Sequence, residues 1–229
     1  MDDRGLSPRD FLDLDRSLAA GIFAGIAYPW EAIPRIAGLV SALIAAPPPG
    51  YALIAPGLLV AEGCSVSKRS EIIGPAIIGP GCEIRAGALI RENVILGAGC
   101  LVGNSSELKN CILFDSALAP HFNYIGDSIL GTSAHLGAGV ILSNFRSDHG
   151  EVKVHLGDGS TIGTGLQKLG AIVGDRAEIG CNSVCFPGSL VGRDSIVYPL
   201  CPVRGHVPAR VLLRAEGLHE PRRGLPGQG

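Results

Sequence analysis

Residues 60–108, VAEGCSVSKRSEIIGPAIIGPGCEIRAGALIRENVILGAGCLVGNSSEL, place an aliphatic side chain at every sixth position without a break in register. These positions are Val60, Val66, Ile72, Ile78, Ile84, Ile90, Leu96, Val102 and Leu108. The spacing resumes over residues 130–142 and again over residues 173–203, and the residue four places after each aliphatic one is usually small. Neither a helix period of 3.6 nor simple strand alternation gives this pattern. A six-residue repeat predicts an all-β solenoid, a parallel β-helix of stacked coils.

The composition agrees with a thin solenoid and excludes several functional classes. The chain has 46% hydrophobic residues, 5% aromatic residues and 33 glycines, which suits a narrow interior filled by short aliphatic side chains. A net charge of -2 gives no electrostatic reason to expect nucleic acid as a partner. The apolar run 36–46 is too short to cross a bilayer, so no membrane partner is expected, and the first residues do not resemble a signal peptide. Seven cysteines without a CxxC pair suggest free thiols in the cytoplasm and no zinc site.

The chain divides into three predicted regions. Residues 1–49 form a helical extension, which the prolines at 47–49 end. Residues 50–207 form the β-helix, with an inserted loop at about 143–172 where the period is absent. Residues 208–229 are expected to form a closing helix, starting near Pro208, and a disordered tail. A loop of about 30 residues in a repeat array is more often functional than incidental, although a flexible excursion of no consequence is the alternative.

The period also converts sequence distance into position. Three hexads close one coil in hexapeptide proteins, so residues 18 apart should lie one above the other, with strands about 4.8 Å apart. Cys64, Cys82 and Cys100 then form a ladder of small buried side chains. Arg91 and Lys109 stack as two cations on one outer face. Either an anion such as a phosphate bridges them or both side chains point into water.

A candidate base lies where the hexad spacing fails, in APHFNYIGD (residues 119–127). His121 follows Pro120 there, and a histidine near neutral pKa is the usual general base for an amine or a hydroxyl. The alternative is a polar surface histidine. The expected position of His121 beside the coil of Lys109 favours a functional role.

These residues also carry a resemblance to a known family. The run from Gly103 to Arg146, GNSSELKNCILFDSALAPHFNYIGDSILGTSAHLGAGVILSNFR, resembles the acetyltransferase half of bifunctional N-acetylglucosamine-1-phosphate uridyltransferases, and a similar run occurs in archaeal sugar-1-phosphate nucleotidylyltransferases. The N-terminal FLDLD and YPWEAI resemble short stand-alone relatives of these proteins. The resemblance implies a left-handed β-helix, a homotrimer and transfer of acetyl from acetyl-CoA to the amine of glucosamine-1-phosphate, in nucleotide-sugar metabolism and without a metal.

The resemblance also implies roles for individual residues. His121 would be the catalytic base, and Ala138 and Cys181 would contact acetyl-CoA. The expected substrate-binding residues are Arg91, Lys109, Tyr124, His135, Asn144 and Lys153. Two positions depart from the family pattern, since His135 replaces an asparagine and Cys181 a serine. The uridyltransferase half is not expected in this chain, because the 50 residues before the solenoid cannot hold a nucleotide-binding α/β domain.

Two other functional classes remain as alternatives to an N-acetyltransferase. The first is a non-catalytic subunit that binds a sugar phosphate or nucleotide sugar, or that acts as a scaffold for a separate nucleotidyltransferase. The second is a γ-type carbonic anhydrase, which needs histidines converging on zinc. The 14-residue spacing of His121, His135 and His149 does not match the close histidine pair of that class.

Overall fold

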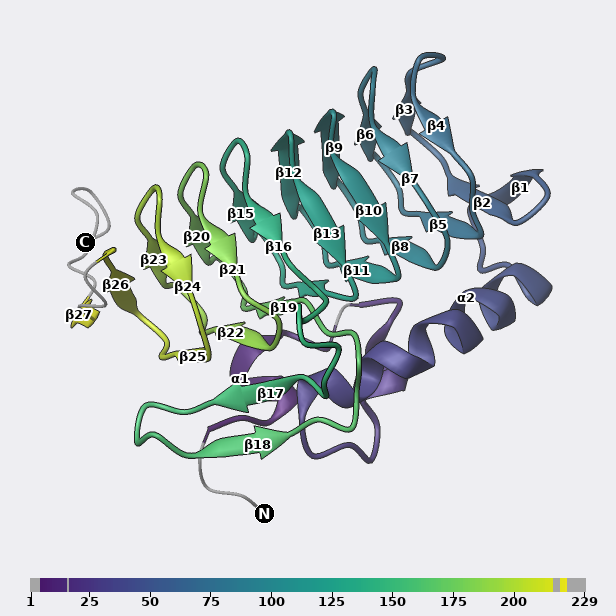
Figure 1. Ribbon diagram of the computed structural model, residues 1–229. Helices are drawn as coiled ribbons and strands as arrows, with labels where there is room; N and C mark the ends of the chain where they lie inside the picture. Colours follow the sequence, from purple (N-terminus) through teal and green to yellow (C-terminus); the bar gives the residue numbers. More distant parts are fainter. Residues whose placement is uncertain (1–4, 16, 216–218, 222–229) are drawn as a thin grey trace, which may run out of the picture.

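The computed structural model describes residues 5–15, 17–215 and 219–221. Three sheets of mostly parallel strands form the sides of a prism of stacked coils (Figure 1). This is the β-helix that the repeat predicts, with the left hand that the family resemblance implies. Val66 pairs with Ile84, and Ile84 pairs with Val102, so one coil takes 18 residues. The coil from Leu108 to Ile125 has 17, because the step from Leu108 to the inward Leu113 is five residues. Ala119 and Ile125 then follow at the usual spacing of six, so the repeat continues through the stretch where the sequence suggested a break.

The chain passes through the three sheets in turn. Sheet A consists of β1 (Tyr51–Ala55), β2 (Leu58–Ala61), β5 (Ala76–Ile78), β8 (Val94–Leu96), β11 (Cys111–Leu113), β14 (Ile129–Leu130), β19 (Ala171–Val173), β22 (Ser189–Val191) and β25 (His206–Val207). Sheet B consists of β3 (Ser65–Val66), β6 (Glu83–Ile84), β9 (Leu101–Asn104), β12 (Leu118–His121), β15 (His135–Leu136), β20 (Glu178–Ile179), β23 (Ile196–Val197), β26 (Val211–Leu213) and β27 (His219–Pro221). Sheet C consists of β4 (Glu71–Ile72), β7 (Leu89–Ile90), β10 (Glu107–Lys109), β13 (Tyr124–Gly126), β16 (Ile141–Leu142), β21 (Val184–Cys185) and β24 (Pro202–Val203).

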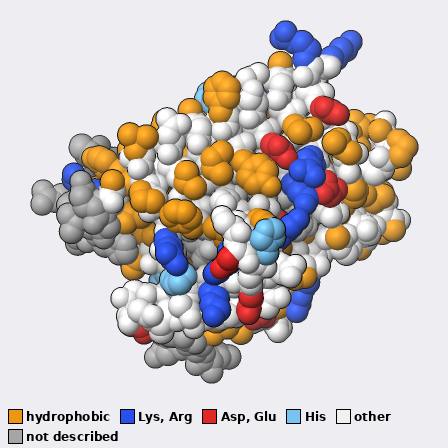
Figure 2. Space-filling model, viewed as in Figure 1, with side chains coloured by type: hydrophobic (Ala, Val, Ile, Leu, Met, Phe, Trp, Pro, Cys, Tyr) orange, Lys and Arg blue, Asp and Glu red, His pale blue; other side chains and the backbone are white. Residues whose placement is uncertain are grey.

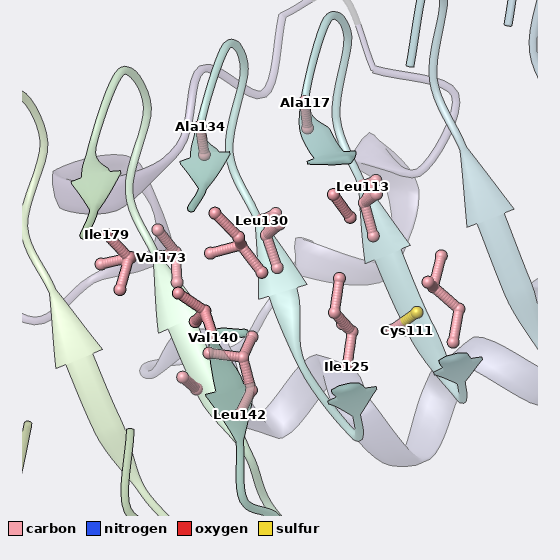
Figure 3. Close-up of a cluster of buried hydrophobic side chains, with 14 of the residues drawn as sticks. Cys111, Leu113, Ala117, Ile125, Leu130, Ala134, Val140, Leu142, Val173 and Ile179 are labelled. Carbon is pink, nitrogen blue, oxygen red and sulfur yellow. The ribbon is translucent and has the colours of Figure 1, made fainter. Parts of the chain in front are cut away.

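The interior of the prism is a column of aliphatic side chains with small residues between them (Figure 3). The predicted thiol ladder is part of it. Cys82 and Cys100 are buried and Cys64 is partly buried, and their Sγ atoms contact the carbonyl oxygens of Gly97, Phe114 and Gly79 at 3.0–3.1 Å. These three cysteines therefore pack as small hydrophobic residues, as predicted.

The outer face of sheet A is also buried, unlike that of a bare solenoid. In seven successive coils the outward residue is aliphatic and at most 1% exposed: Leu59, Ile77, Ile95, Ile112, Ile129, Ile172 and Leu190. They form a second core with side chains of the N-terminal segment, including the fully buried Trp30. In the last coil His206 takes this position and packs edge-on against Phe11. The predicted helical extension therefore covers one side of the prism.

The N-terminal segment consists of short helices. They are α1 (Pro8–Phe11), the 3₁₀ helices η1 (Ala20–Phe23) and η2 (Pro29–Arg35), and α2 (Ile36–Ala45), which ends just before the three prolines. The Asp10 carboxylate accepts hydrogen bonds from the backbone and hydroxyl of Ser7 at 2.7 Å and so caps α1. The buried Asp175 carboxylate accepts from the backbone N–H of Asp13 and fastens this segment to the solenoid.

The insertion is a hairpin and not an irregular loop. β17 (Lys153–His155) pairs antiparallel with β18 (Thr161–Gly163), and the hairpin extends beside the N-terminal segment (Figure 1). Val152, Val154 and Leu169 are buried in the second core. The insertion is thus a second part of the cover over sheet A.

The expected closing helix at residues 208–214 is wrong. Val211–Leu213 is strand β26, which pairs with β23 and turns Leu213 into the solenoid core. Leu213 follows Val207 by six residues, so the segment continues the repeat, and edge pairing prevails over helix formation. The expected tail at 222–229 lies outside the described residues. Within the described part of the chain, none of the helices has the length and apolarity needed to cross a membrane.

Candidate functional site

The stacked cations lie at the edge of sheet C where the chain turns toward sheet A. The backbone N–H of Arg91 donates to the carbonyl of Leu108 at 2.8 Å, so Arg91 and Lys109 occupy adjacent rungs, as predicted. Glu92 lies between them, 3.5 Å from Arg91 Nε and 3.6 Å from Lys109 Nζ. Glu107 accepts from Arg91 Nη1 at 2.9 Å. Carboxylates of the chain itself therefore reduce the repulsion, an arrangement different from both sequence alternatives.

A polar network extends from these cations along sheet C. The hydroxyl of Tyr124 contacts Asn144 Oδ1 at 3.5 Å, and Asn144 Nδ2 donates to the buried carboxylate of Asp127. Asn110 Nδ2 donates to the other oxygen of Asp127 at 2.7 Å. Burial raises the pKa of Tyr124, and the negative charges of Glu107 and Asp127 raise it further, so the phenol stays neutral and can donate. The structure thus gathers Arg91, Lys109, Tyr124 and Asn144 in one region.

Three other predicted residues lie along the opposite edge of sheet C, at the corner with sheet B. In each coil, the backbone N–H of the residue that follows the corner residue donates to the carbonyl of the corner residue in the preceding coil. Gly139 donates to His121 at 3.1 Å, Asn182 to Ala138 at 2.8 Å, and Leu200 to Cys181 at 3.0 Å. His121, Ala138 and Cys181 therefore stack on successive rungs of one corner, and His121 and Cys181 are exposed there. The predicted base and the predicted coenzyme contacts share a single column.

His121 lies on the coil next to that of Lys109, as predicted, but the width of sheet C separates the two residues. His121 ends β12 and pairs with Asn104 of sheet B, whereas Lys109 ends β10 at the far edge of sheet C. Tyr124 begins β13 and lies between the two edges. A ligand that contacts both the base and the cations must therefore lie across the outer face of sheet C.

His135 and Lys153 lie outside this face. His135 is on sheet B, where its Nδ1 is 2.7 Å from Glu178 Oε2. Lys153 begins β17 and lines a cleft beside the hairpin. A single chain does not bring either residue to the face between His121 and Lys109.

Sequence reasoning missed the acidic partners of the site. Glu92 follows Arg91 directly, and Glu107 is two residues before Lys109 and so points to the same side of the sheet. These two spacings indicate that both carboxylates lie near the stacked cations. Asp127 gave a weaker signal, because its contacts with Asn110 and Asn144 depend on two coil turns of 17 residues.

Fold and site together define the class: the chain is a left-handed β-helix protein of the hexapeptide-repeat type. Residues 72–164 match a family model described as the GMPPB C-terminal domain. The sequence is similar to the bifunctional protein GlmU of Methanococcus maripaludis, with 31% identity over 192 residues that cover 79% of this chain and 44% of that protein. It is also similar to a bifunctional sugar-1-phosphate nucleotidylyltransferase/acetyltransferase of Sulfurisphaera tokodaii, with 36% identity over 98 residues, which are 43% of this chain and 24% of that one.

The chain therefore spans less than half the length of these two curated relatives. Among solved structures, a hexapeptide transferase family protein from Anaplasma phagocytophilum aligns with a TM-score of 0.42 and 18% identity, over 70% of this chain and 80% of that one. In the described ranges, no three His, Cys, Asp or Glu side chains cluster as metal ligands would.

Proposed function

We propose that the protein is an acetyl-CoA-dependent N-acetyltransferase whose acceptor is an amino-sugar phosphate resembling glucosamine-1-phosphate. The observation that supports it most is the outer face of sheet C. Arg91, Lys109 and Asn144 lie at one edge, and Tyr124 lies between the edges. His121 lies at the other edge in line with Ala138 and Cys181. The two bifunctional relatives named above carry acetyltransferase or GlmU in their names, which supports the same chemistry.

The acceptor would lie across sheet C with its phosphate at Arg91 and Lys109. Those guanidinium and ammonium groups would exchange part of their contact with Glu92 and Glu107 for the phosphate oxygens. Tyr124 and Asn144 would hold the sugar hydroxyls. The amine would then face His121.

The chemical step is an acyl transfer. His121 would accept a proton from the amine as its nitrogen attacks the thioester carbonyl of acetyl-CoA, forming the C–N bond. The C–S bond breaks, and the coenzyme leaves as a thiolate that takes up a proton. The backbone around Ala138 and the exposed Cys181 would line the path of the coenzyme along the corner. Acetyl-CoA acts here as a co-substrate, and no metal is needed.

A homotrimer, implied by the family resemblance, would complete this arrangement. His135 and Lys153 lie away from the face between His121 and Lys109 in a single chain, so in this proposal they act on the site of a neighbouring copy. Seven free thiols fit the proposed cytoplasmic location. Sedimentation at several protein concentrations would measure the assembly, and a monomer at every concentration would contradict it.

The decisive experiment is turnover with acetyl-CoA and glucosamine-1-phosphate, with the N-acetylated product measured by chromatography. His121→Asn should lower the rate by about 10²–10⁴-fold. His149→Asn is the matched control, because His149 is an exposed histidine of the insertion with a positive φ that asparagine tolerates. Equal background rates for wild type and both variants would rule out the proposal.

A second candidate is a non-catalytic subunit that binds a sugar phosphate and partners a separate nucleotidyltransferase. The two departures from the family pattern favour it, since His135 stands in place of an asparagine and is paired with Glu178, and Cys181 stands in place of a serine in the expected coenzyme site. In that case acetyl-CoA should leave the melting temperature unchanged, while a sugar-1-phosphate should raise it by mass action. A rise with acetyl-CoA would count against this candidate.

A further inference from the structure

A cleft of ≈ 430 Å³ lies between the insertion and the last coils of the solenoid. It begins beside the proposed acceptor site, because its lining residue Ser143 directly precedes Asn144. Its walls include Arg146 and Lys153 from the insertion and Phe186 and Arg204 from the edge of sheet C. Arg204 lies four rungs along the same outer column as Lys109, which at about 4.8 Å per rung is about 19 Å away. A volume of this size suits a small organic ligand.

The charges that line this cleft are unbalanced. Arg146 is held by Asp148, the one carboxylate in the lining. Within residues 5–15, 17–215 and 219–221, Lys153 and Arg204 have no ion pair. In Figure 2, Lys or Arg side chains lie beside a histidine on the hairpin side of this face, apart from a second group of cations next to acidic side chains. Two cations without a carboxylate leave a place for an anion.

The contact between Arg204 and His155 strengthens this reading. Arg204 Nη2 lies 3.2 Å from His155 Nε2, and because a guanidinium only donates, the imidazole must accept and be neutral. Burial lowers the pKa of His155, and the charges of Arg204, Arg146 and Lys153 lower it further. Asp148 is the opposing charge on the wall, and its carboxylate is bound to Arg146. Two cations of the insertion and one from the edge of sheet C therefore converge around one neutral ring.

The remaining walls are aromatic. Phe145 and Phe186 line the cleft and are 39% and 43% exposed. Two exposed phenyl rings next to convergent cations can receive a ligand that joins a flat ring to a negative group.

The backbone builds this cleft with two glycines. Gly188 and Gly205 both have positive φ, and a Cβ would lie 2.9 Å from the carbonyl oxygen of Lys153 and 2.3 Å from that of His155, respectively. Only glycine lets β17 approach the last two coils this closely. The cleft is therefore a fixed feature of the packing between the hairpin and the solenoid.

We propose that this cleft binds a nucleoside phosphate, with the phosphate between Lys153 and Arg204 and the base against Phe145 and Phe186. The proposal does not depend on acetyl transfer. Two sources of this chemistry are possible: the adenosine bisphosphate end of a coenzyme, and the nucleoside diphosphate of a nucleotide sugar.

Calorimetry on the full chain distinguishes these sources, with adenosine 3′,5′-bisphosphate, uridine 5′-diphosphate, inorganic phosphate and uncharged adenosine as probes. At least one nucleotide should bind more tightly than phosphate and adenosine. Tighter binding of the adenosine compound assigns the cleft to a coenzyme, and tighter binding of the uridine compound assigns it to a nucleotide sugar. If neither nucleotide binds, or if phosphate alone binds as tightly, the proposal is overturned.

Variants locate the binding. Arg204→Gln and, independently, Lys153→Gln should each weaken the nucleotide about tenfold or more, since a hydrogen bond to a charged group is lost. Arg69→Gln, an exposed arginine between β3 and β4 at the other end of the solenoid, should leave affinity unchanged. The His155 imidazole, followed by NMR, should titrate at higher pH when the nucleotide is bound. Equal weakening by Arg69→Gln, or an unmoved His155 titration, would contradict binding in this cleft.

Discussion

The outer faces of sheets A and C have the same coil geometry and different surroundings. On sheet A the outward residue of each strand from β2 to β22 is aliphatic and lies beneath the N-terminal segment and the hairpin. On sheet C every equivalent position is half-buried or exposed, and these positions hold Glu71, Leu89, Glu107, Tyr124, Ile141, Val184 and Pro202. The outer face of sheet A is buried in the second core, and the outer face of sheet C is accessible to solvent. The difference arises from one residue per coil.

The largest expected effect comes from truncating Trp30, the largest side chain between the N-terminal segment and sheet A. Trp30 is 1% exposed and stacks on Tyr28 at 4.5 Å, so Trp30→Ala should lower the free energy of unfolding by about 3–5 kcal/mol. Phe122→Ala, at a 59% exposed aromatic on the corner beside sheet C, should change it by less than about 0.5 kcal/mol. Urea unfolding measures both. A loss at Trp30 as small as the loss at Phe122 would mean that the N-terminal segment adds little stability to the solenoid.

A matched pair of isoleucines compares the two faces directly. Ile112 on sheet A and Ile141 on sheet C each precede the inward leucine of their strand. Ile112→Ala should cost about 2–4 kcal/mol because it opens a cavity under the cover. Ile141→Ala should cost less than about 1 kcal/mol. An equal loss at Ile141 that grows with protein concentration would show that another copy of the chain covers sheet C.

The repeat predicted the sheets because inward positions obey a strict spacing. The composition of the strands also indicates which sheet is covered, although the spacing of six alone does not. Most strands of sheet A are wholly apolar, as in AII, VIL and CIL, and only β22 and β25 begin with a polar residue. Strands of sheet C place a polar or small residue beside the inward one more often. A strand buried on both faces shows such continuous apolar runs. The closing helix failed for the related reason that Val207 and Leu213 keep the spacing of six.

The candidate site was predictable only where the register is unbroken. The coil length placed Arg91 above Lys109, because no insertion separates them. It could not place Lys153 or His155 against Arg204, because the insertion has no repeat and its position depends on how the hairpin packs. Gly188 and Gly205 gave no distinct signal among 33 glycines.

A pair of glycines tests that hairpin packing. Gly205 and Gly165 have nearly the same φ, +72° and +71°, but an added Cβ meets His155 at the first and nothing within 4 Å at the second. Gly165→Ala should therefore cost only the conformational penalty, about 1–2 kcal/mol. Gly205→Ala should cost about 1 kcal/mol more, because the hairpin must shift. Thermal melts compare the two, and equal costs would mean that the hairpin moves away without loss.

The smallest expected effect is a pH dependence confined to the hairpin side of the molecule. The pKa of His155 is below its ordinary 6.5 in the folded chain, through burial first and then neighbouring cations. As the pH falls below 6.5, the unfolded chain takes up this proton before the folded chain does, so stability falls until the folded pKa is passed. Above pH 6.5 the ring is mostly neutral in both the folded and the unfolded chain, so His155 lowers the stability little there.

His155→Gln should remove this part of the pH dependence, and His149→Gln, at an exposed histidine of the same insertion, should leave it in place. Melting temperatures at pH 7.5 and 5.5 give the difference. A nucleoside phosphate bound in the cleft would favour the protonated ring and so reduce the fall in wild type. If His155→Gln keeps the whole pH dependence, the imidazole is not held neutral by Arg204, and the charge on this side of the molecule is balanced in another way.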